Sequence, residues 1–233
     1  MEQNIVNIRS VSNSSNITTP PQTQLWIFGG GGAALEVWAV TQSLGIDLGG
    51  FVTIDGKLGF DPLSFPCLRE DEFFMNANPG NATVVFGIGN PVIRKRLAKL
   101  CNERFFNSPS LIHPTVVVGP SVTIGAGTVV MAGAVLETHL SIGRHCLVNV
   151  LVSIAHNCVI GDYTNLGPGC HLPGMVQIAN LCDVGTGCSF KPGVILGPET
   201  VVGAGSTVIG NSGGGITLCG SPAKPLAKRA FGH

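Results

Sequence analysis

The stretch that decides the fold is LSIGRHCLVNVLVSIAHNCVIGDYTNLGPGCHL, residues 140–172. Large apolar side chains recur in it at every sixth position. The same register runs through seventeen consecutive positions: Ile112, Val118, Ile124, Val130, Leu136, Ile142, Val148, Ile154, Ile160, Leu166, Leu172, Ile178, Val184, Phe190, Leu196, Val202 and Val208. This hexapeptide period predicts a parallel β-solenoid, in which short strands stack and share one continuous core.

Two further columns accompany the apolar one. A glycine follows the apolar residue at positions 119, 125, 143, 161, 167, 185, 197 and 203, and we expect it to permit the tight bend between strands. The position two residues before is usually small or β-branched. Five of the eight cysteines fall there: Cys146, Cys158, Cys170, Cys182 and Cys188. We interpret them as small hydrophobic side chains in reduced form, which favours a cytoplasmic compartment.

Residues 25–107 follow a different pattern, in which apolar strands alternate with amphipathic segments. We predict strands over residues 25–28, 50–54 and 83–88, helices over residues 33–44 and 91–104, and a glycine-rich turn over residues 29–32. Pro91 suits a first helical turn. A strand, a glycine turn, a helix and a further strand indicate a Rossmann-like βαβ domain with a parallel sheet.

Composition restricts the function classes. Charged residues make up 11% of the chain and the formal net charge is zero, so neither nucleic acid nor an anionic membrane surface is an expected partner. No apolar run approaches the roughly 18 residues of a membrane span. Residues 1–24 are polar and lack the apolar region of a secretory signal. We therefore divide the chain into a polar extension (1–24), a Rossmann-like domain (25–107) and a β-solenoid with a C-terminal tail (108–233).

Six ordered segments carry a family resemblance: IFGGGGAA, FGIGNPVIRKRL, LIHPTVVVG, IAHNCVIGDY, CHLPG and GSPAKP. Together they resemble the left-handed β-helix acyltransferases, and among these the sugar-nucleotide N-acetyltransferases that acetylate UDP- or dTDP-linked 4-amino-4,6-dideoxysugars. The resemblance implies a homotrimer with active sites between adjacent subunits, acetyl-CoA as cosubstrate, and no metal.

His156 is the candidate catalytic base. Amide formation from a thioester needs a proton acceptor for the amine, and histidine can serve near neutral pH. If three hexads make one coil, Thr138, His156 and Gly174 share a column, and we expect the Gly174 N–H to be free of side-chain cover. In the family the matching histidine is the base and the matching amide faces the thioester oxygen. Asn157 stands where relatives commonly have an acidic residue. The alternative for His156 is an ordinary exposed solenoid residue.

The nucleotide sugar is expected at the carboxyl edge of the Rossmann-like sheet, where open α/β sheets bind ligands. The candidate contacts are Gly29, Gly30, Gly31, Asp55, Gly89 and Asn90, with Asn165 orienting the amino sugar. The glycines could hold a diphosphate through backbone N–H groups. Ala33 departs from relatives, which usually have a histidine there. Ordinary turn chemistry is the alternative for all of these residues.

The resemblance also implies an acetyl-CoA groove. Its candidate contacts are Gly174, Thr186, Gly203, Ala204 and Lys224, the last as a point charge for a phosphate. Two other functions stay open at this point. The chain could be an O-acetyltransferase that acts on a hydroxyl acceptor, or a catalytically impaired binding homologue in which Asn157 and Ala33 record lost activity.

Overall fold

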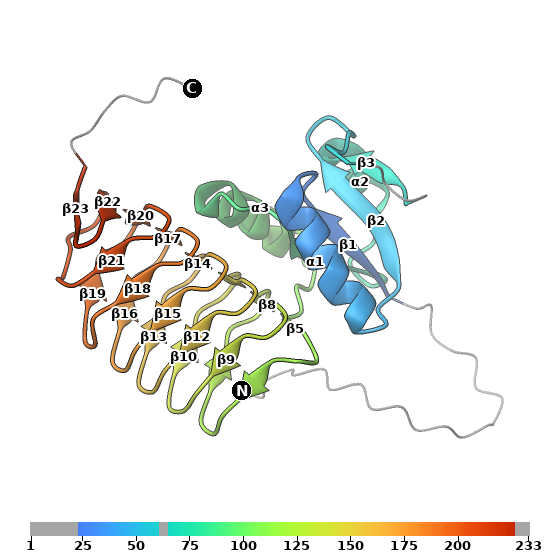
Figure 1. The fold of residues 1–233 in the computed structure, drawn as a ribbon. Coiled ribbons are helices and arrows are strands. Elements are labelled where there is room, and N and C mark those ends of the chain that lie inside the picture. Colours follow the sequence, from blue (N-terminus) through green and yellow to red (C-terminus); the bar gives the residue numbers. More distant parts are fainter. Residues whose placement is uncertain (1–22, 61–64, 227–233) are drawn as a thin grey trace.

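The computed structural model describes residues 23–60 and 65–226 (Figure 1). The N-terminal part is a four-stranded parallel sheet of order β3-β2-β1-β4 with three helices. Its elements are β1 Gln24–Phe28, α1 Gly32–Ser43, β2 Leu48–Thr53, β3 Cys67–Arg69, α2 Glu70–Asn76, β4 Ala82–Phe86 and α3 Pro91–Glu103. The predicted strands and helices are thus confirmed to within a few residues, and the sequence missed β3 and α2.

The rest of the chain is a triangular solenoid. Successive strands of two residues run from β5 (Leu111–Ile112) to β21 (Thr207–Val208). The strands between them are Val117–Val118, Thr123–Ile124, Val129–Val130, Val135–Leu136, Ser141–Ile142, Leu147–Val148, Ser153–Ile154, Val159–Ile160, Asn165–Leu166, His171–Leu172, Gln177–Ile178, Asp183–Val184, Ser189–Phe190, Ile195–Leu196 and Val201–Val202, which are β6 to β20. A hairpin of β22 (Thr217–Gly220) and β23 (Ala223–Pro225) closes the described part.

Each solenoid strand pairs in parallel with the strand three places further along the chain. Ser141 lies opposite Val159, for example, so one coil takes 18 residues. Three sheets result, and each forms one wall of the prism (Figure 1). We name them by their strands: the β5 wall (β5, β8, β11, β14, β17, β20), the β6 wall (β6, β9, β12, β15, β18, β21) and the β7 wall (β7, β10, β13, β16, β19).

The predicted apolar column fills the prism. From Val130 onward its members are buried within one continuous core. At the start of the solenoid the burial is incomplete, and Val118 is 47% exposed. No preceding coil covers this end, because stacking buries a residue only between neighbours.

The bends lie elsewhere than predicted. A left-handed backbone occurs three residues after the apolar position, as at Asn157 (φ 60°), Tyr163 (φ 60°) and Gly169 (φ 64°). The glycines directly after the apolar residues have no such φ. Instead, a Cβ at Gly161 would lie 2.5 Å from Asn180 N of the next coil. Glycine is therefore needed there for the close stacking of coils, and our expectation that it forms the bend is wrong.

The cysteine column is buried as predicted and also makes hydrogen bonds. Cys146 Sγ donates to Gly161 O at 3.1 Å and Cys182 Sγ to Gly197 O at 3.3 Å. Thr164 Oγ1 does the same in this column, with Ala179 O as acceptor. Each side chain thus partners a turn carbonyl of the following coil. The eight cysteines are free thiols, and burial raises the pKa of Cys146 and of Cys182 to about 11.

The N-terminal sheet packs on the solenoid. One face of the sheet and α1 share a core with Leu111, Val129, Met131 and Leu147 of the β5 wall and its first turns. The opposite face is covered by α2 and α3 (Figure 1). The ends of the N-terminal strands are therefore held at a fixed place beside the solenoid. No helix in the described ranges has the length and apolarity to cross a membrane.

Candidate active site

His156 lies on the turn between β12 and β13, at the edge where the β6 and β7 walls meet. Its side chain is exposed, and its Nδ1 lies 2.9 Å from Asn157 Oδ1. An amide oxygen only accepts hydrogen bonds, so Nδ1 carries the proton in this pair. The neutral ring then has its lone pair on Nε2, as a general base requires. Asn157 holds this tautomer without a charge.

Gly174 lies one coil beyond His156 in the same column. The column is confirmed by two backbone bonds of neighbouring coils, from Asn157 N to Thr138 O at 3.1 Å and from Met175 N to His156 O at 2.9 Å. A Cβ on Gly174 would lie 2.5 Å from His156 Cε1, so the ring rests against its Cα. Gly174 is buried, and our expectation that it lacks side-chain cover is wrong. Its N–H has no acceptor among the described residues.

The glycine-rich turn connects β1 to α1. Gly29 has φ +132°, and a Cβ there would lie 2.3 Å from Gly87 O. At Gly30 a Cβ would lie 2.8 Å from Thr53 Cγ2, whereas Gly31 and Gly32 face open space. The first N–H groups of α1 have no backbone acceptor in the described part. This geometry can receive an anion at the helix N-terminus.

A cavity of about 240 Å³ lies between this helix and the solenoid. Its walls come from α1 (Ala33 and Glu36), from Gly89 after β4, and from β11, β14 and β17 with their following turns. Thr186 and Asn165, both predicted site residues, line it as well. The Asn165 amide nitrogen donates to Gly89 O, and to Asp183 Oδ1 at 3.2 Å. The structure therefore brings Asn165, Gly89 and Thr186 together.

Asp55 and Asn90 lie outside this cavity lining, and their side chains are occupied by turn contacts. Asp55 Oδ1 accepts from Lys57 N at 3.2 Å, and Asn90 Oδ1 caps α3 by accepting from Val92 N at 2.9 Å. Both residues are exposed at the carboxyl edge of the sheet, as predicted. Turn chemistry explains the two side chains as the structure has them.

The remaining acetyl-CoA candidates follow the solenoid toward its C-terminal end. Gly203 and Ala204 form the turn after β20, and Lys224 is exposed on β23 opposite Cys219. They do not line the cavity. With Thr186 they follow turns of successive coils, which is the path of a groove along the prism. Among residues 23–60 and 65–226, no cluster of three or more His, Cys, Asp or Glu side chains is placed to hold a metal.

Known proteins share this architecture. Residues 139–174, which include both His156 and Gly174, match the family model described as bacterial transferase hexapeptide (six repeats). A GDP-perosamine N-acetyltransferase of Escherichia coli is 29% identical over 176 residues, which are 73% of this chain and 76% of the relative.

Two solved structures extend the match over nearly the whole fold. PerB from Caulobacter crescentus, in complex with CoA and GDP-perosamine, has a TM-score of 0.82 and 29% identity over 88% of this chain and 97% of its own. The acetyltransferase domain of PglB from Neisseria gonorrhoeae has a TM-score of 0.81 and 30% identity, over 88% of this chain and 100% of its own. The chain belongs to the hexapeptide-repeat sugar N-acetyltransferase family. Its solenoid is a left-handed β-helix, and the protein is a sugar N-acetyltransferase.

In this sugar N-acetyltransferase the two candidate regions lie at different edges of the prism. His156 follows β12, at the edge between the β6 and β7 walls. The cavity lies on β11, β14 and β17 of the β5 wall and on the turns that lead to the β6 wall. One chain therefore holds the two parts apart.

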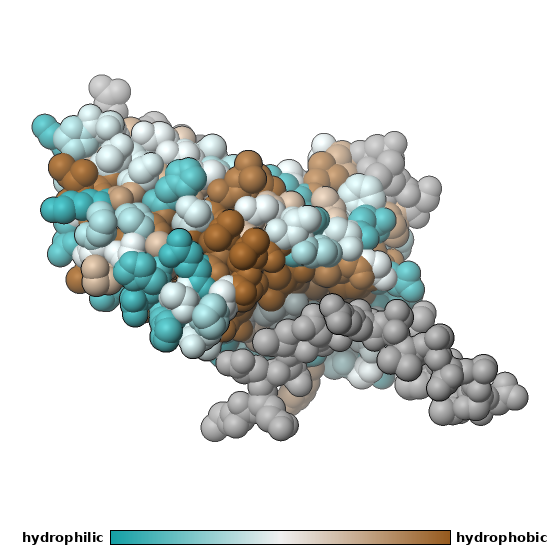
Figure 2. Space-filling model, turned by 60° about the horizontal axis from the view of Figure 1, so that its bottom comes forward, coloured by the Kyte–Doolittle hydropathy of each residue, from teal (hydrophilic) through white to brown (hydrophobic). Residues whose placement is uncertain are grey.

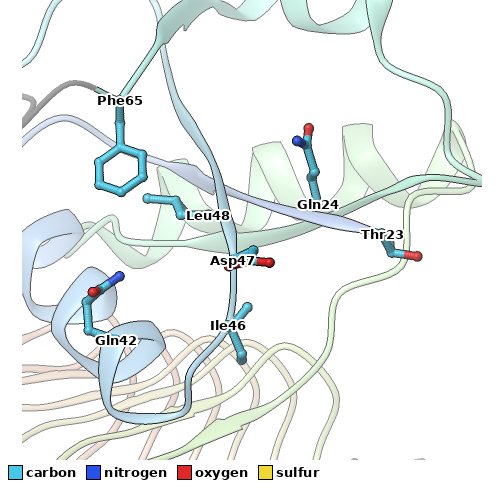
Figure 3. Close-up of a pocket in the computed structure, with 7 residues that line it drawn as sticks. All are labelled: Thr23, Gln24, Gln42, Ile46, Asp47, Leu48 and Phe65. Carbon is cyan, nitrogen blue, oxygen red and sulfur yellow. The ribbon is translucent and has the colours of Figure 1, made fainter. Parts of the chain in front are cut away.

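A larger pocket of this N-acetyltransferase, about 350 Å³, lies away from both regions (Figure 3). Thr23, Gln24, Asp47 and Leu48 line it, at the start of β1 and β2. The glycine-rich turn follows the opposite end of β1. Volume alone would select this pocket, but the predicted site residues converge on the smaller cavity, which we take as the substrate region.

Sequence reasoning missed several residues of the site. Glu36, Asn149 and Asp183 line the cavity and were not singled out. Arg94 was also overlooked, although it is buried on the same helix face as Leu97, Ala98 and Cys101. A charged residue in the apolar stripe of an amphipathic helix was the available signal.

Proposed function

We propose that this sugar N-acetyltransferase transfers the acetyl group of acetyl-CoA to the amino group of a nucleotide-linked 4-amino-4,6-dideoxysugar. The observation that carries the proposal is the His156–Asn157 hydrogen bond, which leaves Nε2 free to accept a proton beside the unpaired N–H of Gly174. The CoA and GDP-perosamine in the PerB structure, and acetyl coenzyme A in one PglB structure, support the two substrate classes. GDP therefore joins UDP and dTDP as a candidate nucleotide.

The reaction proceeds by direct attack. The amine nitrogen forms a bond to the thioester carbon while His156 Nε2 takes a proton from that nitrogen. The Gly174 N–H donates to the developing oxyanion. The carbon–sulfur bond then breaks, and the imidazolium returns its proton to the sulfur, so the products are the N-acetyl sugar and CoA. General base catalysis of this kind contributes about 10²- to 10⁴-fold, and one oxyanion donor about 10²- to 10³-fold.

The nucleotide sugar occupies the cavity beside α1. Its diphosphate binds the free N–H groups at the glycine-rich turn, where the helix dipole favours an anion. The sugar extends toward Gly89 and Asn165, and Asp55 and Asn90 lie at the same sheet edge for the nucleoside. Acetyl-CoA follows the turns with Thr186, Gly203 and Ala204, and its phosphates reach Lys224.

A second copy of the chain completes the site. Because His156 and the cavity lie at different edges of one prism, His156 of one subunit must face the cavity of its neighbour, as in a closed trimer. Exposed apolar side chains support such contact: Val117, Leu151 and Met175 are 60%, 65% and 54% exposed. Figure 2 shows apolar surface gathered in the middle of one face of the molecule. Patches of this kind mark interaction surfaces.

Loss of thioester absorbance tests the reaction, since a thiol reagent would also react with the exposed Cys219. Acetyl-CoA is mixed with 4-amino-4,6-dideoxysugars linked to GDP, UDP or dTDP, and with their 4-hydroxy counterparts. We expect turnover only with an amino sugar. His156→Ala should lower kcat by about 10²- to 10⁴-fold, and His113→Ala, at an exposed histidine of the first coil, should not. Turnover of the hydroxy sugars would establish O-acetyl transfer, and no turnover of any acceptor would favour a binding homologue.

A further inference from the structure

Arg94 is a buried charged residue that joins the two parts of the molecule. It lies on α3 with 1% of its surface exposed. Its Nε donates to His145 O at 2.8 Å and its Nη2 to Tyr163 O at 2.7 Å. Its Nη1 donates to Ile88 O and, at 3.4 Å, to Gly89 O. One guanidinium thus contacts the loop after β4 and two successive coils of the solenoid.

The contacts are specific to the shape of a guanidinium. His145 and Tyr163 are corner residues 18 positions apart, so their carbonyls stack one coil spacing from each other, roughly 4.8 Å. Neither carbonyl accepts a backbone N–H in the described part of the chain. The planar fork of arginine can reach both and still reach the loop, whereas a lysine ammonium is a single point charge.

This arrangement is costly for folding, which indicates a purpose beyond packing. No carboxylate forms an ion pair with Arg94 among the described residues. Burial lowers its pKa to about 10. A hydrophobic side chain of similar volume would often fill such a position with equal or better stability. The charge is therefore best explained by the geometry that it imposes on residues 88–90.

A second donor converges on the same peptide. Asn165 Nδ2 donates to Gly89 O from the solenoid side and is itself held by Asp183 Oδ1 at 3.2 Å. Gly89, Asn165 and Asp183 all line the substrate cavity. Arg94 from behind and Asn165 from the front thus fix one wall of the cavity relative to the solenoid.

We propose that Arg94 is a positioning residue that holds the loop of residues 88–90 in register with the solenoid and so presets the wall that binds the nucleotide sugar. The inference rests on the proposed function and goes beyond it, since Arg94 touches no substrate. It also assigns Asn165 a role through Gly89. The loop should move when Arg94 is replaced, and the nucleotide-sugar site should weaken while the acetyl-CoA site, along other turns, stays intact.

The test compares Arg94→Lys and Arg94→Met with a matched control, Met131→Ala. Met131 is 1% exposed and packs in the core shared by the two parts, but it does not line the cavity. All three variants lose domain-to-domain contacts. For each we would measure binding of GDP, UDP and dTDP by calorimetry, KM for the nucleotide sugar and for acetyl-CoA, kcat, and the melting temperature.

We expect both Arg94 variants to weaken nucleoside diphosphate binding and to raise the nucleotide-sugar KM at least tenfold, with kcat and the acetyl-CoA KM within about twofold of the parent. Met131→Ala should lower the melting temperature and leave these constants near the parent values. Equal effects of Arg94→Lys and Met131→Ala on nucleotide binding would overturn the positioning role and leave the proposed function standing. If the parent binds no nucleoside diphosphate, the proposed function fails, and the inference fails with it.

Discussion

The imidazole of His156 rests against the Cα of Gly174, where a Cβ would lie 2.5 Å from Cε1 and 2.6 Å from Nε2. The two residues are 18 positions apart and meet because one coil of the solenoid takes 18 residues. Glycine at this place sets the height of the candidate base above the wall. The position of His156 is thus determined by the coil that follows it.

Gly174→Ala should displace the imidazole while preserving the fold. The position has no left-handed backbone, so alanine brings no strain of its own. We expect kcat to fall by about 10- to 100-fold, since misplacement of a reacting group by about 1 Å can cost that much. Gly213→Ala is the control, because a Cβ there meets nothing within 4 Å. Steady-state kinetics with parent-like activity of Gly174→Ala would contradict the assignment.

Asn157→Asp should move the pH dependence of catalysis. A carboxylate next to Nδ1 favours the protonated ring, so the acidic limb of the kcat/KM profile should shift to higher pH by about one unit. Aspartate also tolerates the left-handed backbone of this corner. Asn157→Gly keeps the backbone and removes the acceptor, and it should lower the rate without moving the limb. Identical limbs in the parent and in Asn157→Asp would show that position 157 does not act on the base.

His145 should make folding sensitive to mild acid. Burial, chiefly, lowers its pKa to about 4, and its ring stacks on Tyr163 at 5.3 Å. The unfolded chain binds a proton near pH 6.5, so below that pH the unfolded state is favoured and stability falls toward pH 4. Between pH 6.5 and 5 the loss is about 2 kcal/mol, and it is absent above that window. Urea unfolding of His145→Phe, which keeps an aromatic ring, should show a flatter dependence. An unchanged slope would exclude His145 as the cause.

The hydrogen bonds of the inner column can be tested at Cys182. Its Sγ donates to Gly197 O, and Thr164 and Thr200 occupy the same column in the neighbouring coils. Cys182→Thr should keep the donor and the stability. Cys182→Val has the same shape without a donor, leaves the carbonyl unpaired, and should cost about 1 kcal/mol. Chemical unfolding compares the two variants, and equal stability would show that the column acts by volume alone.

The solenoid was predictable because its signal is local and repeated. Each apolar residue, from Val130 to Val208, contributes to one pattern of period six, and a strand of two residues needs no other information. By contrast, β3 and α2 have three and seven residues, which is too short for a periodic pattern to appear. The role of Gly161 was misjudged for another reason. A glycine that permits a bend and one that permits close stacking look alike until the next coil is in place.

The candidate site was predictable in its parts and not in its assembly. His156 and Asn157 are adjacent in the chain, so their pairing follows from one short segment. The contacts of Arg94 with His145 and Tyr163 join residues 51 and 69 positions apart, and that of Asn165 with Gly89 joins residues 76 apart. Such contacts depend on how the N-terminal sheet docks on the solenoid, and no local pattern encodes this.

The coil of 18 residues also restricts how such a chain can change in length during evolution. Loss or gain of one whole coil leaves every later residue on its original wall, so a longer or shorter protein arises with its surface chemistry intact. Loss of a single hexad before residue 156 would rotate everything after it by one wall relative to the N-terminal domain, although every strand would still pair. The gene can therefore vary smoothly in sequence but only in large, discrete steps in length.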